Sequence, residues 1–142
     1  MPFAGHTPFH ARWSAHHRPV ASGTHTGTCA ITRPGSGDGT LVDGVWTPPA
    51  ATTVYTGPCR VTPLSGNSRY VVAGEQRTIL RGYEIAITWD ATLIHEGDTC
   101  EVLTAQDPRL EGVQLRVLDV RMGSEQWERV LIAEQDLTDL EA

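Results

Sequence analysis

The sequence predicts an all-β protein: a small antiparallel β-barrel or sandwich with a short N-terminal arm or helix and a long inter-strand loop. From residue 26 onward, short runs of alternating apolar and polar residues are separated by turn residues, and helical periodicity is nearly absent. The chain has 142 residues, enough for one domain with a single core. We expect an arm at 1–25, a barrel domain at 26–136 and an acidic tail at 137–142.

The N-terminal arm is rich in histidine, proline and small polar residues. We expect a short helix around residues 8–17, bounded by Pro8 and Pro19. Its apolar side would carry Phe9, Trp13 and His16 or His17. His6 and His10 have the spacing of two ligands on one helix face, and His25 follows later. Because Pro8 separates them and no carboxylate or cysteine is near, we expect an exposed polar arm, with no metal and no cofactor.

The first strands are expected at residues 27–33 and 41–46. Asp43-Gly44 in the second run is a tight-turn dipeptide, so this part of the chain predicts a hairpin. The segment PGSGDGT (34–40) resembles a phosphate-binding loop, but no helix pattern follows it and the chain has no lysine. We expect it to be a mobile hairpin tip.

A further extended run covers about Thr53 to Val61, where Pro58 predicts a strand edge or a bulge. The next stretch, residues 64–76, contains Gly66-Asn67 and Gly74. It predicts a long loop or a loosely paired ribbon.

The strongest strand pattern is YEIAITWD, in which Tyr83, Ile85, Ile87 and Trp89 share one face. The preceding RTIL predicts a long strand that is kinked at Gly82. Further strands are expected at 99–103 and 127–134. His95-Glu96-Gly97-Asp98 is interpreted as a turn between strands rather than as an acid/base pair.

The run from Val113 to Met122 changes its apolar face part-way along. Val113, Leu115 and Val117 alternate with polar residues, and then Leu118, Val120 and Met122 become the apolar set. A bulge near Val117 and Leu118 would insert one residue, tighten the twist and bend the strand as a small barrel requires. The alternative is a strand whose second half is covered on both sides, for example by a neighbouring subunit.

Composition narrows the function. The absence of lysine excludes P-loop, Schiff-base and pyridoxal chemistry, and no nucleophile motif is present. We therefore expect no enzyme. Cys29, Cys59 and Cys100 are interpreted as buried small apolar residues. A net charge of −6 disfavours tight binding of nucleic acid, and no apolar run is long enough to span a membrane.

The remaining residues favour an interaction or assembly role. Aromatic residues and arginine are enriched in protein interfaces. The candidates of these types are Trp46, Tyr55, Tyr70, Trp127, Arg60, Arg69, Arg77, Arg81, Arg109, Arg116, Arg121 and Arg129.

The order of short motifs is similar to that in a known virion family. VYTGPCRV (54–61), YEIAITW (83–89), EGDTCEVL (96–103), DPRLEG (107–112) and LRVLDVRMGSEQWERVLIAE (115–134) follow one another across about residues 26–136. This succession resembles the head-to-tail stopper, or head-closure, proteins of long-tailed bacteriophages, particularly those of actinobacteria.

The resemblance implies a β-barrel protein of the virion neck, made in the bacterial cytoplasm, with no catalytic residues. It would form a homo-oligomeric ring, a hexamer or a dodecamer, between the portal or head-tail adaptor and the tail terminator. Packaged double-stranded DNA would pass through without specific binding, and the ring would help to retain it. The candidate lumen or inter-ring residues are Leu64, Ser65, Gly66, Asn67, Ser68, Arg69, Tyr70, Gly74 and Gln76. The candidate subunit contacts are Arg116, Leu118, Val120, Arg121, Trp127 and Arg129.

Three other functions stay open at this point. The chain could be another neck protein, such as an adaptor or tail terminator. It could be a monomeric β-barrel binding module. It could also be a metal-dependent β-barrel enzyme that uses the histidines of the arm.

Overall fold

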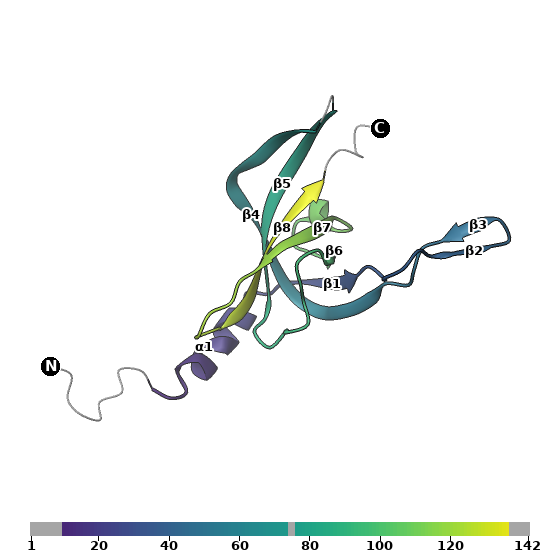
Figure 1. The fold of residues 1–142 in the computed structure, drawn as a ribbon. Coiled ribbons are helices and arrows are strands. Elements are labelled where there is room, and N and C mark those ends of the chain that lie inside the picture. Colours follow the sequence, from purple (N-terminus) through teal and green to yellow (C-terminus); the bar gives the residue numbers. More distant parts are fainter. Residues whose placement is uncertain (1–9, 74–75, 137–142) are drawn as a thin grey trace.

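The protein is a closed six-stranded antiparallel β-barrel with three projections (Figure 1). The computed structural model describes residues 10–73 and 76–136. The barrel strands follow the order β1-β4-β5-β8-β7-β6 around the barrel. Their bounds are β1 Gly27–Arg33, β4 Thr52–Ala73, β5 Gln76–Thr88, β6 Thr99–Thr104, β7 Gln114–Val120 and β8 Glu128–Asp136. A short 3₁₀ helix, η1 (Pro108–Leu110), lies between β6 and β7. The predicted all-β barrel is confirmed.

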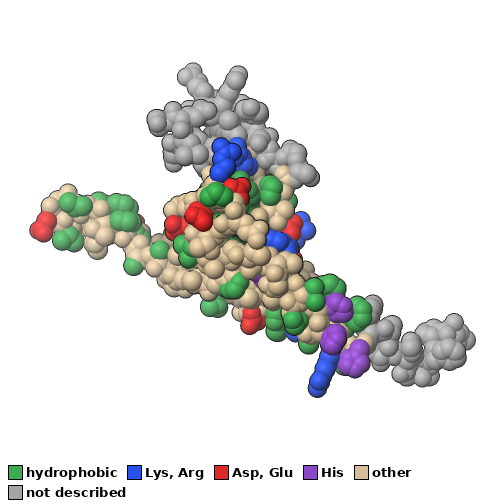
Figure 2. Space-filling view, turned by 180° about the vertical axis from the view of Figure 1, so that it is seen from behind, with side chains coloured by type: hydrophobic (Ala, Val, Ile, Leu, Met, Phe, Trp, Pro, Cys, Tyr) green, Lys and Arg blue, Asp and Glu red, His purple; other side chains and the backbone are tan. Residues whose placement is uncertain are grey.

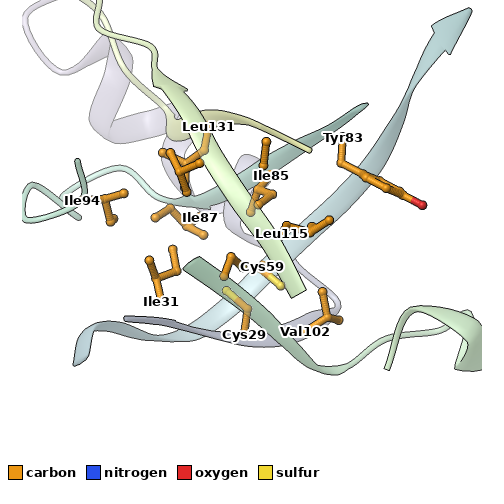
Figure 3. Close-up of a cluster of buried hydrophobic side chains, with 13 residues drawn as sticks. Cys29, Ile31, Cys59, Tyr83, Ile85, Ile87, Ile94, Val102, Leu115 and Leu131 are labelled. Carbon is orange, nitrogen blue, oxygen red and sulfur yellow. The ribbon is translucent and has the colours of Figure 1, made fainter. Parts of the chain in front are cut away.

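The core lies inside the barrel and follows the predicted alternation (Figure 3). Ile85 and Ile87 of β5 are fully buried, whereas Trp89, beyond the end of this strand, is 39% exposed. The three cysteines are buried and free, as predicted. The hydrogen bond with Cys100 raises the pKa of Cys29 and, together with burial, outweighs the lowering effect of Cys59. The hydrogen bond with Cys29, followed by burial, raises the pKa of Cys59, so both thiols stay protonated. These thiols act as small core side chains.

The change of face in β7 is a β-bulge. Val117 pairs with Ala133 and Asp119 pairs with Ile132, so Leu118 is the extra residue. Val117 is 1% exposed and Leu118 is 39% exposed, while Val120 packs against the core again. The extra residue therefore exchanges the two faces and bends the strand, as predicted.

The long β4 changes partners along its length. It pairs with β1 up to Cys59 and with β5 from Cys59 onward, so Pro58 lies at a local edge of the ladder, which agrees with the prediction. Residues 64–76 were predicted as a long loop or a loosely paired ribbon, and the structure has the ribbon. Residues 68–73 pair with residues 76–81, and the register shifts between Pro63 and Ser68. This ribbon of β4 and β5 extends beyond the barrel (Figure 1).

A small hairpin, β2 (Thr40–Val42) and β3 (Val45–Thr47), is inserted between β1 and β4. Asp43 and Gly44 have φ of 51° and 78° and form its tip. The glycine-rich segment 34–39 is therefore not the tip: it is the connector from β1 into the hairpin. Gly39 has φ of 72°, and a Cβ there would lie 2.5 Å from the Thr47 carbonyl oxygen and 3.0 Å from the Trp46 ring. Glycine is needed at this position because only it permits both the backbone angle and the close contact.

The N-terminal helix, α1 (Trp13–Ser22), begins later than predicted and contains Pro19. The expectation that Pro19 ends the helix is wrong. Proline removes one helical hydrogen bond, but contacts between α1 and the barrel hold the helix together. The guanidinium of Arg18 lies 3.5 Å from the centroid of the Trp89 ring, and the ring of His17 stacks on Trp127 with centroids 4.7 Å apart. Pro8 and Phe9 lie outside the described residues. No helix in the described ranges is long and apolar enough to cross a membrane.

The segment 95–98 is a turn, as interpreted from the sequence, and Asp98 is its anchor. Asp98 is 2% exposed, and its carboxylate accepts hydrogen bonds from Arg33 Nε at 3.0 Å and from Arg33 Nη2 at 3.1 Å. It also accepts one from the His95 amide at 2.8 Å. Arg33 Nη2 donates to the Leu93 carbonyl as well. These bonds fix the loop after β5 against the end of β1.

Candidate assembly surfaces

The β2–β3 hairpin carries apolar side chains that the barrel does not cover. Their exposed fractions are 71% for Leu41, 57% for Val42, 66% for Val45 and 60% for Trp46. Figure 2 shows these side chains gathered on an arm that stands away from the barrel. Trp46 Nε1 donates to the Asp38 carbonyl at 3.1 Å, which holds the indole at the base of the hairpin. Exposed apolar residues concentrated on a projection are typical of a contact with another protein.

A second apolar surface lies at the end of the barrel. We call it the end pocket; it has a volume of about 340 Å³ and is lined by Ile94, Val120, Met122 and Arg129, among others. Met122 is 85% exposed. Leu93, the residue before Ile94, is 64% exposed. The pocket therefore combines apolar side chains with one guanidinium.

The guanidinium of Arg129 is held in place by backbone carbonyls. Nη1 donates to the Arg121 carbonyl at 3.3 Å and Nη2 donates to the Trp89 carbonyl at 3.2 Å. Nε is buried and has no hydrogen-bond partner among the described residues. Within the same part of the chain, Arg129 forms no ion pair with a carboxylate. Its positive charge is thus fixed in position without an ion pair to a described carboxylate, although Glu96 lines the same pocket.

The β7 bulge builds a third surface, the bulge groove. It has a volume of about 240 Å³ and is lined by Leu64, Leu80, Gly82, Leu118 and Ile132, with Ala133 and Glu134. Leu118 points to this groove because the bulge excludes it from the core. The bulge therefore places Leu118 and Val120 in different surfaces.

Polar contacts anchor α1 and the segment after it to the barrel. The side chain of His25 is 1% exposed, and its Nε2 lies 2.9 Å from Glu128 Oε2. Arg60 Nη2 donates to Glu128 Oε1 at 2.8 Å. Burial opposes ionisation of Glu128, but the hydrogen bonds from His25 and Arg60 outweigh it and lower the pKa of this carboxyl. Glu128 is therefore ionised at neutral pH and holds two strands and the N-terminal segment together.

The predicted contact residues fall into separate places. Val120 and Arg129 line the end pocket, and Leu118 lines the bulge groove. Arg121 and Arg116 are exposed, and Arg116 pairs with Thr99 and Glu134 in the barrel. Trp127 is 40% exposed and lies under the ring of His17.

The predicted lumen or inter-ring residues lie on the ribbon. Leu64 lines the bulge groove. The side chains of residues 65–70 and of Gln76, and the whole of Gly74, lie outside the described part of the structure.

The sequence did not indicate several surface residues. Leu41, Val42, Val45 and Met122 were not predicted as contacts. A signal was present at 41–46, because apolar residues flank Asp43-Gly44 on both sides without a polar alternate. A hairpin of that composition has no face suited to water.

Comparison with known families places the chain in one of them. Residues 17–134 match the model of a family of unknown function, DUF6093. The chain belongs to this family. The matched segment begins within α1, includes the hairpin and the bulge, and ends in β8. No curated protein matches the chain. Among the described residues, no three His, Cys, Asp or Glu side chains are grouped as metal ligands would be.

Proposed function

We propose that this protein is a structural component of the phage neck, a head-to-tail stopper that assembles as a ring between the portal or adaptor and the tail. The observation that carries the assembly role is the exposed apolar hairpin, since a monomer leaves Leu41, Val45 and Trp46 in water. The order of strand and turn motifs, which resembles that of head-closure proteins, supports the specific place in the virion.

The charge of the protein fits a passage for DNA. The chain carries a net charge of −6, and a ring repeats that charge around its channel. Such a ring repels the phosphate backbone by long-range electrostatics and does not retain DNA by binding it. Retention in this proposal is steric, and the ribbon of β4 and β5 beyond the barrel is the segment we assign to the lumen or to a neighbouring ring.

The virion itself provides the test. In a phage that encodes this chain, a nonsense codon in its gene should give filled heads that lose their DNA or fail to take tails, as seen by electron microscopy. Complementation with the intact gene should restore particles, and the protein should be detected at the neck of purified virions. Normal titre without the protein, or its absence from virions, would overturn the neck role.

The ribbon has a separate test. We expect that replacing residues 65–79 by a two-residue Asn-Gly turn preserves the barrel, because residues 68–73 pair only with residues 76–81, and the retained residues 80–81 also pair with β8. Complementation with this variant should give particles that leak DNA or lack tails. Wild-type titre would exclude a role of the ribbon in the neck.

A monomeric binding module is the second candidate, favoured by one cavity. A pocket of about 410 Å³ is lined by Thr26, Cys59, Arg60 and Val102, among others. Its size falls in the range of small-ligand sites. A purified protein that stays monomeric and is absent from virions would favour this candidate.

A further inference from the structure

We propose that the β2–β3 hairpin of one copy docks into the end pocket of a second copy, with Asp43 of the tip beside Arg129. This inference deepens the proposed ring function by naming the two surfaces that meet. The occupant of the pocket is another molecule of this chain.

The two surfaces are complementary in chemistry. The hairpin presents Val42 and Val45 on either side of an acidic residue, Asp43, which makes no ion pair with any described residue. The end pocket presents Met122 and the partly buried Val120 beside a guanidinium that makes no ion pair with a described carboxylate, and Ile94, only 4% exposed, completes its apolar lining. Apolar contacts would bury both sets, and the carboxylate would reach a fixed cation.

The pocket lining carries one guanidinium and one carboxylate. Arg129 and Glu96 both line it, so the carboxylate of Asp43 meets one negative neighbour there as well as the cation. The proposed pairing therefore depends on placement of the tip beside Arg129 rather than on an excess of positive charge in the lining.

The geometry favours contact between copies over contact within one copy. The hairpin leaves the barrel between β1 and β4 and stands on the side away from α1 (Figure 1). The pocket is at the α1 side: Arg129 binds the carbonyl of Trp89, whose ring carries Arg18 of α1. Figure 2, seen from behind, shows the same separation between the apolar arm and the histidines of α1.

A contact between two different surfaces of identical chains is heterologous. Such a contact leaves one free hairpin and one free pocket at the ends, so further copies add, and a ring forms where the rotation between neighbours closes. The hairpin–pocket contact thus gives a physical route from this monomer to a ring.

Cross-linking between single-cysteine variants tests the contact. Val42→Cys and Met122→Cys place thiols at the hairpin tip and in the pocket, while the native cysteines are buried. A short bis-maleimide added to the mixture of both variants should give dimers on a denaturing gel. A mixture of Val42→Cys with Val20→Cys, which is 72% exposed on α1, should not.

Charge reversal sharpens the test. Adding Asp43→Arg to the Val42→Cys variant should lower the cross-linked fraction about fivefold, the effect of losing roughly 1 kcal/mol of ion pairing. Circular dichroism of each variant confirms that the barrel is intact. The proposal is overturned if the mixture gives no dimers at about 100 µM protein, or if Val42→Cys alone cross-links as well as the mixture does.

The outcome is distinguishable from that of the neck proposal. Dimers from the mixture together with absence from virions would uphold the docking contact and exclude the neck role. Presence at the neck without cross-linking would uphold the neck role and exclude this contact.

Discussion

The barrel interior and the β2–β3 hairpin use the same residue types in opposite environments. Ile31, Ile85 and Leu131 are fully buried, whereas Leu41 and Val45 are 71% and 66% exposed. Each strand of the closed barrel has a neighbouring strand on both sides, and its apolar residues serve stability by filling the interior. The hairpin is joined to the barrel by two connectors and shares no ladder with it. Its apolar residues therefore contribute little to the stability of the monomer and are available to a second molecule.

The largest expected effect comes from truncating the core. Leu131→Ala removes a fully buried side chain and should lower the free energy of unfolding by about 2–5 kcal/mol, because it leaves a cavity in the barrel. Leu41→Ala makes the same change on the hairpin and should alter it by less than about 0.5 kcal/mol. Urea unfolding measures both. Equal losses would mean that the hairpin is part of the folded core.

The next effect concerns the bulge that separates the core from the bulge groove. Deleting Leu118 leaves Val117 paired with Ala133 and Asp119 with Ile132, so the ladder keeps its register and loses only the bend. We expect this variant to fold with a loss of about 1–3 kcal/mol. Deleting Arg116 instead turns Val117 away from the core and should prevent folding.

Circular dichroism and thermal unfolding compare the two deletions. If deletion of Leu118 unfolds the protein as completely as deletion of Arg116, the bend at the bulge is itself required to close the barrel. If both variants are as stable as the wild type, the assigned register is wrong.

A smaller effect on stability is expected at Glu128, whose contacts with His25 and Arg60 anchor the segment after α1 to the barrel. Because His25 and Arg60 lower the folded-state pKa of Glu128, the stability that this carboxylate supplies is fully present above its unfolded-state pKa. It is lost as the pH falls from about 4.3 through the lower folded-state value. Glu128→Gln should reduce this acid-dependent loss in urea unfolding measured from pH 7 to pH 3.

The matched control is Glu101→Gln, at an exposed position of β6. This variant should retain the pH dependence of the wild type, because the Glu101 carboxylate makes no ion pair with any residue that the structure describes. A Glu128→Gln profile that equals the wild-type profile would mean that other carboxylates account for the acid sensitivity.

Local pattern was sufficient for most of the barrel. Alternation located the core face of β5, and the interruption of alternation located the bulge at Leu118. Both features depend on neighbours within a few residues, so the sequence contains them directly. The course of α1 through Pro19 was not predictable, because contacts such as that of His17 with Trp127 join residues far apart in the chain.

The candidate docking surfaces were only partly predictable, for a similar reason. The end pocket combines the loop after β5 with the ends of β7 and β8, which closure of the barrel brings together. The hairpin was expected, but the pattern of a short apolar run does not distinguish a strand inside a barrel from one outside it. Only the topology, which places β2 and β3 outside the closed sheet, reveals that their side chains are exposed.

The smallest effect on the stability of the barrel is expected at Gly39, where a substitution should affect the hairpin alone. A methyl group there would meet the Thr47 carbonyl oxygen at 2.5 Å and the Trp46 ring at 3.0 Å, at a φ of 72° that disfavours alanine. Gly39→Ala should therefore disorder the hairpin and increase amide exchange at residues 40–47. Urea unfolding of the barrel should change by less than about 0.5 kcal/mol, since the barrel strands are untouched.

Gly37→Ala is the matched control, because Gly37 also has a positive φ, 112°, but a methyl group there meets nothing within 4 Å. If both variants show the same increase in amide exchange, backbone strain alone accounts for the disorder of the hairpin. If only Gly39→Ala shows the increase, the disorder comes from the clash of the added methyl group with Trp46 and Thr47. Gly39→Ala should also reduce the Val42–Met122 cross-link, because docking requires an ordered tip. A hairpin that disorders without loss of cross-linking, or that unfolds the barrel with it, would contradict the division between a self-sufficient core and an arm built for a partner.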